Sequence, residues 1–168
     1  MKVRACEPAD LVAVQAIYAH HVLNGFGTFE EEPPPLEEMR RRYDTLLAAH
    51  FPFLVAEVDG EVAGYAYAGP FRARSAYRHT CENSVYIAPA LQRRGAGHAL
   101  MHVLIEECRR RGLKQMLAVI GDSANHGSIG LHTRLGFRPV GVFKDVGYKL
   151  GRWVDVVMMQ LTLGDPAP

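Results

Sequence analysis

The sequence predicts an α/β (α+β) protein built on a mixed, mostly antiparallel sheet with helices on both faces. The main observation is the order of its segments: strand, two helices, three strands, helix, strand, helix and two strands. No repeat, linker or low-complexity stretch interrupts this order. We therefore expect residues 1–168 to form a single domain.

The first half of the chain contains one short strand and two helices. A strand at residues 2–5 precedes a helix that opens at Pro8 and ends near Gly25. Its apolar side chains recur at helical spacing, at Leu11, Val14, Ile17, Tyr18 and Val22. Residues 25–35 carry three glutamates before three prolines, which predicts an irregular loop. The next helix should bury Leu36, Met39, Tyr43, Leu46 and Leu47.

A hairpin opens the second half. Asp59 and Gly60 are typical of a tight turn, so the strands at 53–58 and 61–68 should pair antiparallel. After a loop at 69–78, the expected elements are a strand at 79–87, a helix at 97–111, a strand at 115–120, a helix at 123–135, and strands at about 138–148 and 152–160.

Composition excludes several classes of protein. The chain has 19 Lys and Arg against 18 Asp and Glu, so its charge favours neither nucleic acid nor an anionic membrane as a partner. Its three scattered cysteines and ungrouped histidines argue against a disulfide framework or a metal site. No apolar run approaches the ~20 residues of a membrane span, and no signal-peptide core opens the chain. We expect a cytoplasmic protein that binds no metal.

One glycine-rich stretch resembles an anion cradle. Gln92-Arg93-Arg94-Gly95-Ala96-Gly97 joins the 79–87 strand to the helix that begins near His98. Gly95 and Gly97 let backbone N–H groups converge beside the helix N-terminus, which suits a pyrophosphate. A glycine-rich turn that merely enters a helix is the alternative. The stretch lacks the Gly-Lys-Ser/Thr of a P-loop and the third glycine of a dinucleotide fingerprint.

A second segment makes the pattern more specific. It consists of Asn125, Ser128, Leu131, His132, Leu135, Gly136 and Phe137. Together with Gln92-x-x-Gly95-x-Gly97, it resembles the GNAT superfamily of N-acetyltransferases. Segments 72–77, 82–86 and 147–156 are similar to the branch that contains phosphinothricin and methionine sulfoximine or sulfone acetyltransferases. The resemblance implies a GNAT fold in which the central strands at 79–87 and 115–120 splay apart.

The resemblance also implies acetyl-CoA as co-substrate. Its pyrophosphate would meet the glycine-rich stretch, and its pantetheine arm would meet the second segment and the edge of the 79–87 strand. The expected cofactor-binding residues are Val85, Tyr86, Ile87, Gln92, Arg93, Arg94, Gly95, Ala96, Gly97, His98, Asn125 and Ser128. Asn125 is equally a natural helix N-cap, as are Asp122 and Ser123.

Two side chains are candidates for proton transfer. Strand alternation puts Glu82 on one face with Ser84 and Tyr86, where its carboxylate can take a proton from an ammonium directly or through water. The resemblance assigns the general base to this glutamate, and a solvent-facing or salt-bridged glutamate is the alternative. His132 stands where the superfamily often has a proton-donating tyrosine. It is either an acid or base or a structural histidine.

The acceptor pocket is expected around the loop before the Glu82 strand. Arg72 and Arg74, with Tyr77, can hold a carboxylate beside the reacting amine, and Phe29 can wall the pocket. This suits a small amino acid or analogue; a solvated loop is the alternative. A polyamine, aminoglycoside or protein N-terminus as acceptor, or a noncatalytic acyl-CoA-binding regulator, are the other functions considered. The resemblance implies a homodimer, and the apolar stretch 154–159 suits either a partner surface or the core.

Overall fold

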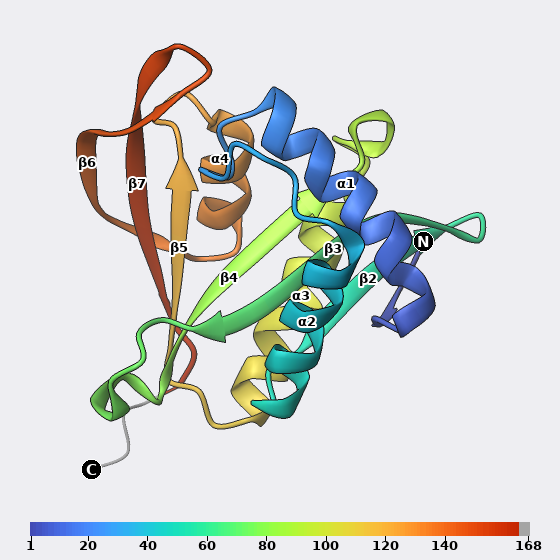
Figure 1. Ribbon diagram of the computed structural model, residues 1–168. Helices are drawn as coiled ribbons and strands as arrows, with labels where there is room; N and C mark the ends of the chain where they lie inside the picture. Colours follow the sequence, from blue (N-terminus) through green and yellow to red (C-terminus); the bar gives the residue numbers. More distant parts are fainter. Residues whose placement is uncertain (165–168) are drawn as a thin grey trace.

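The structure, a computed structural model, describes residues 1–164 (Figure 1). Its strands are β1 Lys2–Ala5, β2 Phe53–Val58, β3 Glu61–Pro70, β4 Thr80–Ile87, β5 Gln115–Gly121, β6 Arg138–Lys149 and β7 Arg152–Thr162. Its α-helices are α1 Leu11–Asn24, α2 Leu36–Ala48, α3 Ala96–Arg110 and α4 His126–Arg134. Short 3-10 turns occupy Pro8–Asp10, Ser75–Tyr77 and Pro89–Leu91. The predicted order of elements is confirmed, and most of the predicted ends lie within one or two residues of the observed ones.

All seven strands form one sheet in the order β1-β2-β3-β4-β5-β7-β6. Every neighbouring pair is antiparallel except β4 and β5. These two strands run parallel and pair only from Thr80 opposite Gln115 to Glu82 opposite Leu117. The expectation of a mostly antiparallel sheet with two splayed central strands is therefore confirmed.

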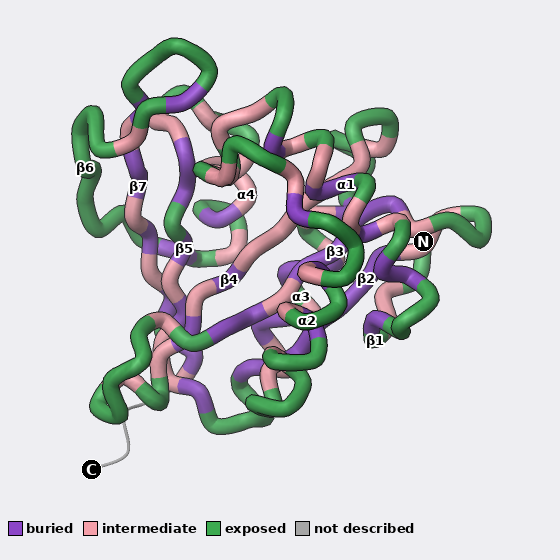
Figure 2. The backbone as a smooth tube through the Cα atoms, in the orientation of Figure 1, coloured by how far each residue is buried: buried purple, intermediate pink, exposed green. Residues whose placement is uncertain are grey.

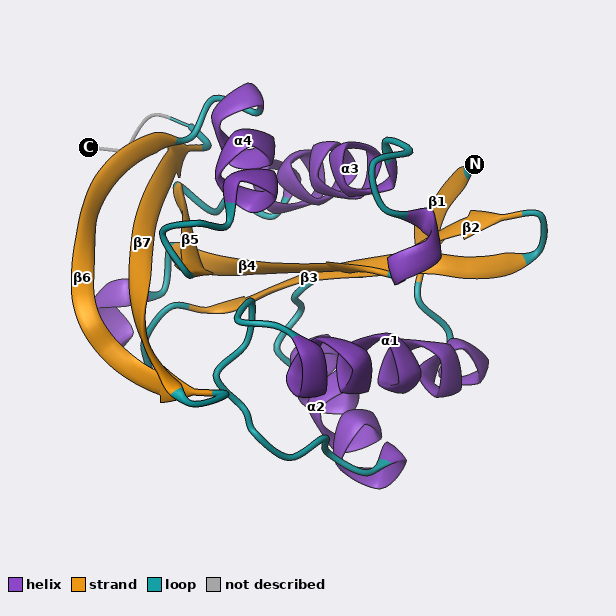
Figure 3. Cartoon of the chain, turned by 90° about the horizontal axis from the view of Figure 1, so that it is seen from above, coloured by secondary structure: helices purple, strands orange, loops and turns teal. Residues whose placement is uncertain are grey.

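Helices cover both faces of the sheet, as Figure 3 shows: α1 and α2 lie on one face, and α3 and α4 lie on the other. The two layers enclose separate apolar clusters, one with α3 and one with α1 and α2. Side chains of β4 alternate between them, because Val85 and Ile87 pack with the α3 cluster and Tyr86 packs with the other. Buried stretches follow the central strands in Figure 2.

Two hairpins close with two-residue turns whose residues both have positive φ. These are Asp59 (53°) with Gly60 (83°), and Leu150 (49°) with Gly151 (79°). This pair of conformations matches a type I′ turn, whose twist suits antiparallel strands. The turn at Leu150 aligns Lys149 with Arg152 across the β6–β7 hairpin.

The outer edge strand β6 is almost wholly exposed, although it is rich in apolar residues. Exposed apolar side chains of this hairpin are Val140, Val142, Phe143, Val146, Tyr148 and Trp153. The neighbouring strand β7 instead buries Val154, Val156, Val157 and Met159. Of the two readings left open for 154–159, the core is therefore the one that the structure supports.

Candidate active site

A cavity of about 810 Å³ opens where β4 and β5 separate. Its walls come from the start of α3, from α4, from the splayed strands and from the α1–α2 loop. Asn83 bridges the strands just beyond their last backbone pair, because its Nδ2 donates to the Leu117 carbonyl at 3.0 Å. The gap therefore begins at a defined position in the sheet.

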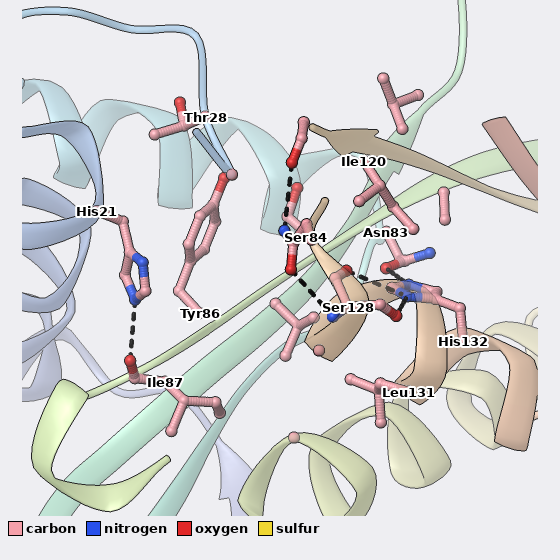
Figure 4. Close-up of a pocket in the computed structure, with 18 of the residues that line it drawn as sticks. His21, Thr28, Asn83, Ser84, Tyr86, Ile87, Ile120, Ser128, Leu131 and His132 are labelled. Atoms are coloured by element: carbon pink, nitrogen blue, oxygen red, sulfur yellow. Dashed lines mark hydrogen bonds between the residues drawn. The ribbon is translucent and has the colours of Figure 1, made fainter. Parts of the chain in front are cut away.

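The two faces of β4 give the cavity two chemically different sides. Glu82, Ser84 and Tyr86 line it from the α1 side, and Asn83 and Val85 line it from the α3 and α4 side. Figure 4 shows Tyr86 with Thr28 and His21 on one side of β4, and Asn83 with His132 on the other. The gap between β4 and β5 thus joins the α1 side of the cavity to its α3 and α4 side.

Glu82 lies partly buried in this cavity, on the last residue of β4 that pairs with β5. Burial raises the pKa of its carboxyl above the usual value. No side chain within residues 1–164 donates a hydrogen bond to it or forms an ion pair with it. The salt-bridged alternative for Glu82 is therefore not what the structure shows, and a raised pKa suits a proton acceptor.

His132 is 2% exposed and held at both ring nitrogens. Nδ1 lies 2.8 Å from the Ser128 carbonyl oxygen, and Nε2 lies 3.0 Å from Asn83 Oδ1. Both partners are acceptors, whereas a neutral imidazole has one N–H, so protonation would complete both hydrogen bonds. Burial works against the charge and lowers the pKa of His132. His132 therefore lines the cavity as a buried residue whose ring is held in place by Ser128 and Asn83.

The glycine-rich stretch wraps the start of α3. Gly95 is its N-cap residue with a φ of 86°, a conformation that favours glycine. Of the expected cofactor residues, the cavity is lined by Gln92, Arg93, Gly95, Gly97 and His98 together with Val85, Tyr86, Ile87, Asn125 and Ser128. Arg94 and Ala96 do not line it. Ala96 packs into the α3 core, and the Ile87 carbonyl already accepts from His21 Nε2 at 2.9 Å.

Asn125 has the capping role that its position allowed. Its Oδ1 accepts from the Ser128 N–H at 3.1 Å, and its Nδ2 donates to the Gly121 carbonyl at 3.2 Å. Both ends of the amide are thus engaged within the chain, although the residue lines the cavity.

The α1–α2 loop forms a wall of the cavity that extends beyond the expected Phe29. Phe26, Gly27, Thr28 and Phe29 line the cavity, and Thr28 Oγ1 lies 2.8 Å from the Tyr18 hydroxyl. The loop reaches β5 because Gly121 has no side chain; a Cβ there would collide with the Phe26 carbonyl oxygen. In the sequence, Gly121 at the end of a strand is the feature that could have indicated this close approach of another backbone segment.

Arg72, Arg74 and Tyr77 do not line the cavity. They belong to the β3–β4 connection, where both arginines are exposed. The Arg72 guanidinium lies 5.1 Å from the Phe71 ring centroid and 5.8 Å from that of Tyr77. The structure therefore groups Arg72 with aromatic neighbours of its own loop rather than with Glu82.

Within residues 1–164, no three His, Cys, Asp or Glu side chains are grouped closely enough to hold a metal ion. In the same part of the chain, no helix combines the length and apolar character needed to cross a membrane.

Comparison with known proteins agrees with this geometry. Residues 3–158 match the family model of the acetyltransferase (GNAT) domain. A phosphinothricin N-acetyltransferase from Alcaligenes faecalis is 51% identical over 97% of this chain and 84% of its own. An L-methionine sulfoximine/L-methionine sulfone acetyltransferase from Pseudomonas aeruginosa is 42% identical over 98% and 95%. A solved GNAT superfamily phosphinothricin acetyltransferase from Sinorhizobium meliloti, in complex with acetyl-CoA, has a TM-score of 0.94 and 43% identity, over 97% of this chain and 88% of that one.

Proposed function

Because the chain belongs to the GNAT acetyltransferase family, we propose that it acetylates the primary amine of phosphinothricin, methionine sulfoximine, methionine sulfone or a closely similar amino acid. It is an acetyl-CoA-dependent N-acetyltransferase for a small amino-acid-like amine. The observation that carries the proposal is the cavity through the split sheet, with Glu82 on the α1 side and the glycine-rich stretch at the start of α3. We assign residues 1–168 to one catalytic domain.

The residues at the start of α3 fit a pyrophosphate-bearing co-substrate. Gly95 takes a left-handed conformation, and Arg93, Gly95, Gly97 and His98, at or just before the start of α3, line the same cavity. Gln92, Gly97, His98, Val85 and Ser128 would line the bound acetyl-CoA, which supplies the activated acetyl thioester. A helix N-terminus with a nearby arginine offers both N–H donors and positive charge to phosphate oxygens.

We assign Glu82 the role of general base. Its carboxylate can take the proton from the acceptor ammonium, directly or through a water, on the α1 side of the gap. A raised pKa keeps the carboxylate basic enough for that transfer near neutral pH. We propose that His132 delivers a proton to the departing CoA thiolate, while Asn83 and Ser128 hold its ring in place.

The double variant Gly95→Ala with Arg93→Ala should weaken acetyl-CoA binding about tenfold or more, because a charge-assisted hydrogen bond contributes roughly 1.5–3 kcal/mol. Calorimetric titration with acetyl-CoA measures this. Gly112→Ala is the matched control, since Gly112 also has a positive φ (77°) with open space around it, at the far end of α3. Unchanged acetyl-CoA affinity in a folded double variant would remove the assignment.

A screen of amines, scored by CoA release with a thiol reagent, tests the acceptor class. Phosphinothricin and methionine sulfone should be acetylated at least about tenfold faster than their methyl esters or a polyamine, because loss of one charge-assisted contact costs about that factor. Arg72, Arg74 and Tyr77 lie outside the cavity lining, but their loop leads directly into β4 and Glu82, so we propose that they meet the acceptor carboxylate as it enters. Arg74→Ala should therefore reduce the preference for the acid over its ester.

Arg78→Ala is the control for this screen, because Arg78 is an exposed arginine of the same loop. An Arg74→Ala enzyme with the full preference for the free acid would argue against the arginine clamp. A polyamine as the best acceptor would argue against the amino-acid class itself. Glu30 does not favour a cationic acceptor, because its carboxylate is already paired with Arg42, which donates to it at 2.6 and 2.9 Å.

We also propose that the enzyme is a cytoplasmic homodimer. The β6–β7 hairpin exposes apolar side chains along an unpaired sheet edge, including Phe143 at 59% and Trp153 at 62% exposure. A second copy of the chain would cover this face. Cys6, Cys81 and Cys108 are buried free thiols, a state typical of a reducing compartment.

A further inference from the structure

Lys149 is a buried lysine with no role in the chemistry described above. It is the last residue of β6, and only 2% of its surface is exposed. Its Nζ donates to two backbone carbonyls of the α1–α2 loop, to Gly25 at 2.7 Å and to Thr28 at 2.8 Å. Lys149 thus holds the loop that lines the cavity, although it lies more than 100 positions away in the chain, at 124 residues from Gly25 and 121 from Thr28.

The loop has several attachments, but most lie on the side of α1 and α2. Tyr18 binds Thr28, and Arg42 binds Glu30. On the opposite side, the loop meets the β6–β7 hairpin, where a Cβ on Gly147 would approach Phe29 Cε2 to 2.9 Å. Lys149 adds two charge-assisted hydrogen bonds at this second side. It therefore spans from the hairpin to the segment that carries Phe26 and Phe29.

A buried ammonium is an expensive way to satisfy two carbonyl groups. Within residues 1–164, Lys149 forms no ion pair, and burial lowers the pKa of its ammonium group while Glu31 and Glu30 oppose that shift. An uncharged residue would avoid the desolvation cost. Nearby Lys144, by contrast, sits on the surface with Asp155 as its partner. We therefore infer that Lys149 serves to fix the conformation of the loop and not to stabilise the fold.

We propose that Lys149 is a positioning residue that holds the loop segment 26–29 against the mouth of the cavity and thereby sets the affinity for the acceptor. The inference rests on the proposed function, because it assigns the α1 side of the cavity to the acceptor amine. It predicts that loss of the lysine affects the acceptor and leaves acetyl-CoA binding intact, because the hydrogen bonds of Lys149 go to the α1–α2 loop and not to the start of α3.

The test compares Lys149→Met with Lys144→Met, which removes an exposed lysine from the same strand. Lys149→Met should raise KM for the acceptor about tenfold or more, with the Kd for acetyl-CoA within about twofold of wild type. Hydrogen exchange of the peptide covering 25–32 should accelerate in this variant, with α3 peptides unchanged. Lys144→Met should leave the acceptor KM, the acetyl-CoA Kd and the hydrogen exchange of the loop unchanged.

Equal losses for both substrates, or unchanged exchange in the loop, would overturn the inference. Hydrogen exchange needs no turnover, so it decides the role of Lys149 even where the wild-type enzyme acetylates no amino acid and the proposed function fails. Lys149→Arg provides a second variant that keeps the charge. It should show a smaller rise in acceptor KM than Lys149→Met, and it decides the question where the methionine variant does not fold.

Discussion

Glu82→Gln is expected to lower kcat by roughly 10²–10⁴-fold, the range typical of a lost general base. This corresponds to about 3–5 kcal/mol of activation free energy. The amide keeps the size and the hydrogen bonding of the side chain but cannot accept a proton from the acceptor ammonium. Steady-state kinetics with saturating acetyl-CoA and acceptor measure the loss. Higher pH should restore part of the rate, because more of the acceptor amine is then already deprotonated.

The same substitution should not destabilise the fold. Burial raises the pKa of Glu82 in the folded state, so its ionised form opposes folding at pH values above the unfolded pKa. The glutamine variant lacks this penalty, and its Tm at neutral pH should equal or exceed that of the wild type. In the wild type, kcat/KM should fall as pH drops through the raised pKa, and this acid limb should vanish in the variant.

Glu61→Gln serves as the control, because Glu61 is an exposed strand glutamate outside the cavity. A folded Glu82→Gln enzyme with near wild-type kcat would exclude Glu82 as the base and leave His132 or a water chain. A lower Tm together with lower activity would indicate a structural role instead.

Asn83→Leu should lower the free energy of unfolding by about 2–6 kcal/mol, because it leaves two buried polar groups without a partner at roughly 1–3 kcal/mol each. These groups are the Leu117 carbonyl and His132 Nε2, both bonded to the 6% exposed Asn83 amide at 3.0 Å. Urea denaturation measures the change. Asn24→Leu is the control, since Asn24 is exposed at the end of α1.

A double-mutant cycle with His132→Phe distinguishes this contact from general packing. Replacing both partners by apolar side chains should cost less than the sum of the single changes, because no imidazole nitrogen is then left unpaired. Additive losses would show that Asn83 and His132 do not act as a unit. The cycle thus tests whether the histidine is held by the residue that bridges the two central strands.

Much of the cofactor side of the cavity could be predicted from local patterns. The glycines at 95 and 97 indicated a turn into a helix, and the structure starts α3 at Ala96 with Gly95 in a left-handed conformation. Asn125 was identified as a natural cap, and it caps α4. The exceptions are Arg94 and Ala96, which belong to the same stretch but do not line the cavity; Ala96 is buried in the α3 cluster instead.

The acceptor side was harder to predict because its residues come from distant parts of the chain. On that side, Thr28 meets Lys149 and Phe26 meets Gly121; on the other side of β4, Asn83 meets His132 in the same way. None of these pairs has a characteristic spacing, since each depends on how loops and helices pack against the sheet. For the same reason, the loop that carries Arg72 and Arg74 was expected beside Glu82, whereas the structure leaves both arginines exposed and outside the cavity.

Three features could be read from the sequence alone: the order of the strands and helices, the tight turn at Gly60, and the family resemblance that identifies the reaction class. These features depend on side-chain periodicity and on backbone preferences that act over a few residues. Other features depend on how the chain packs: where β4 and β5 separate, which residues line the gap, and the burial of Lys149 against the α1–α2 loop. Those outcomes follow from the burial and hydrogen bonding of residues far apart in the chain, which no local pattern encodes.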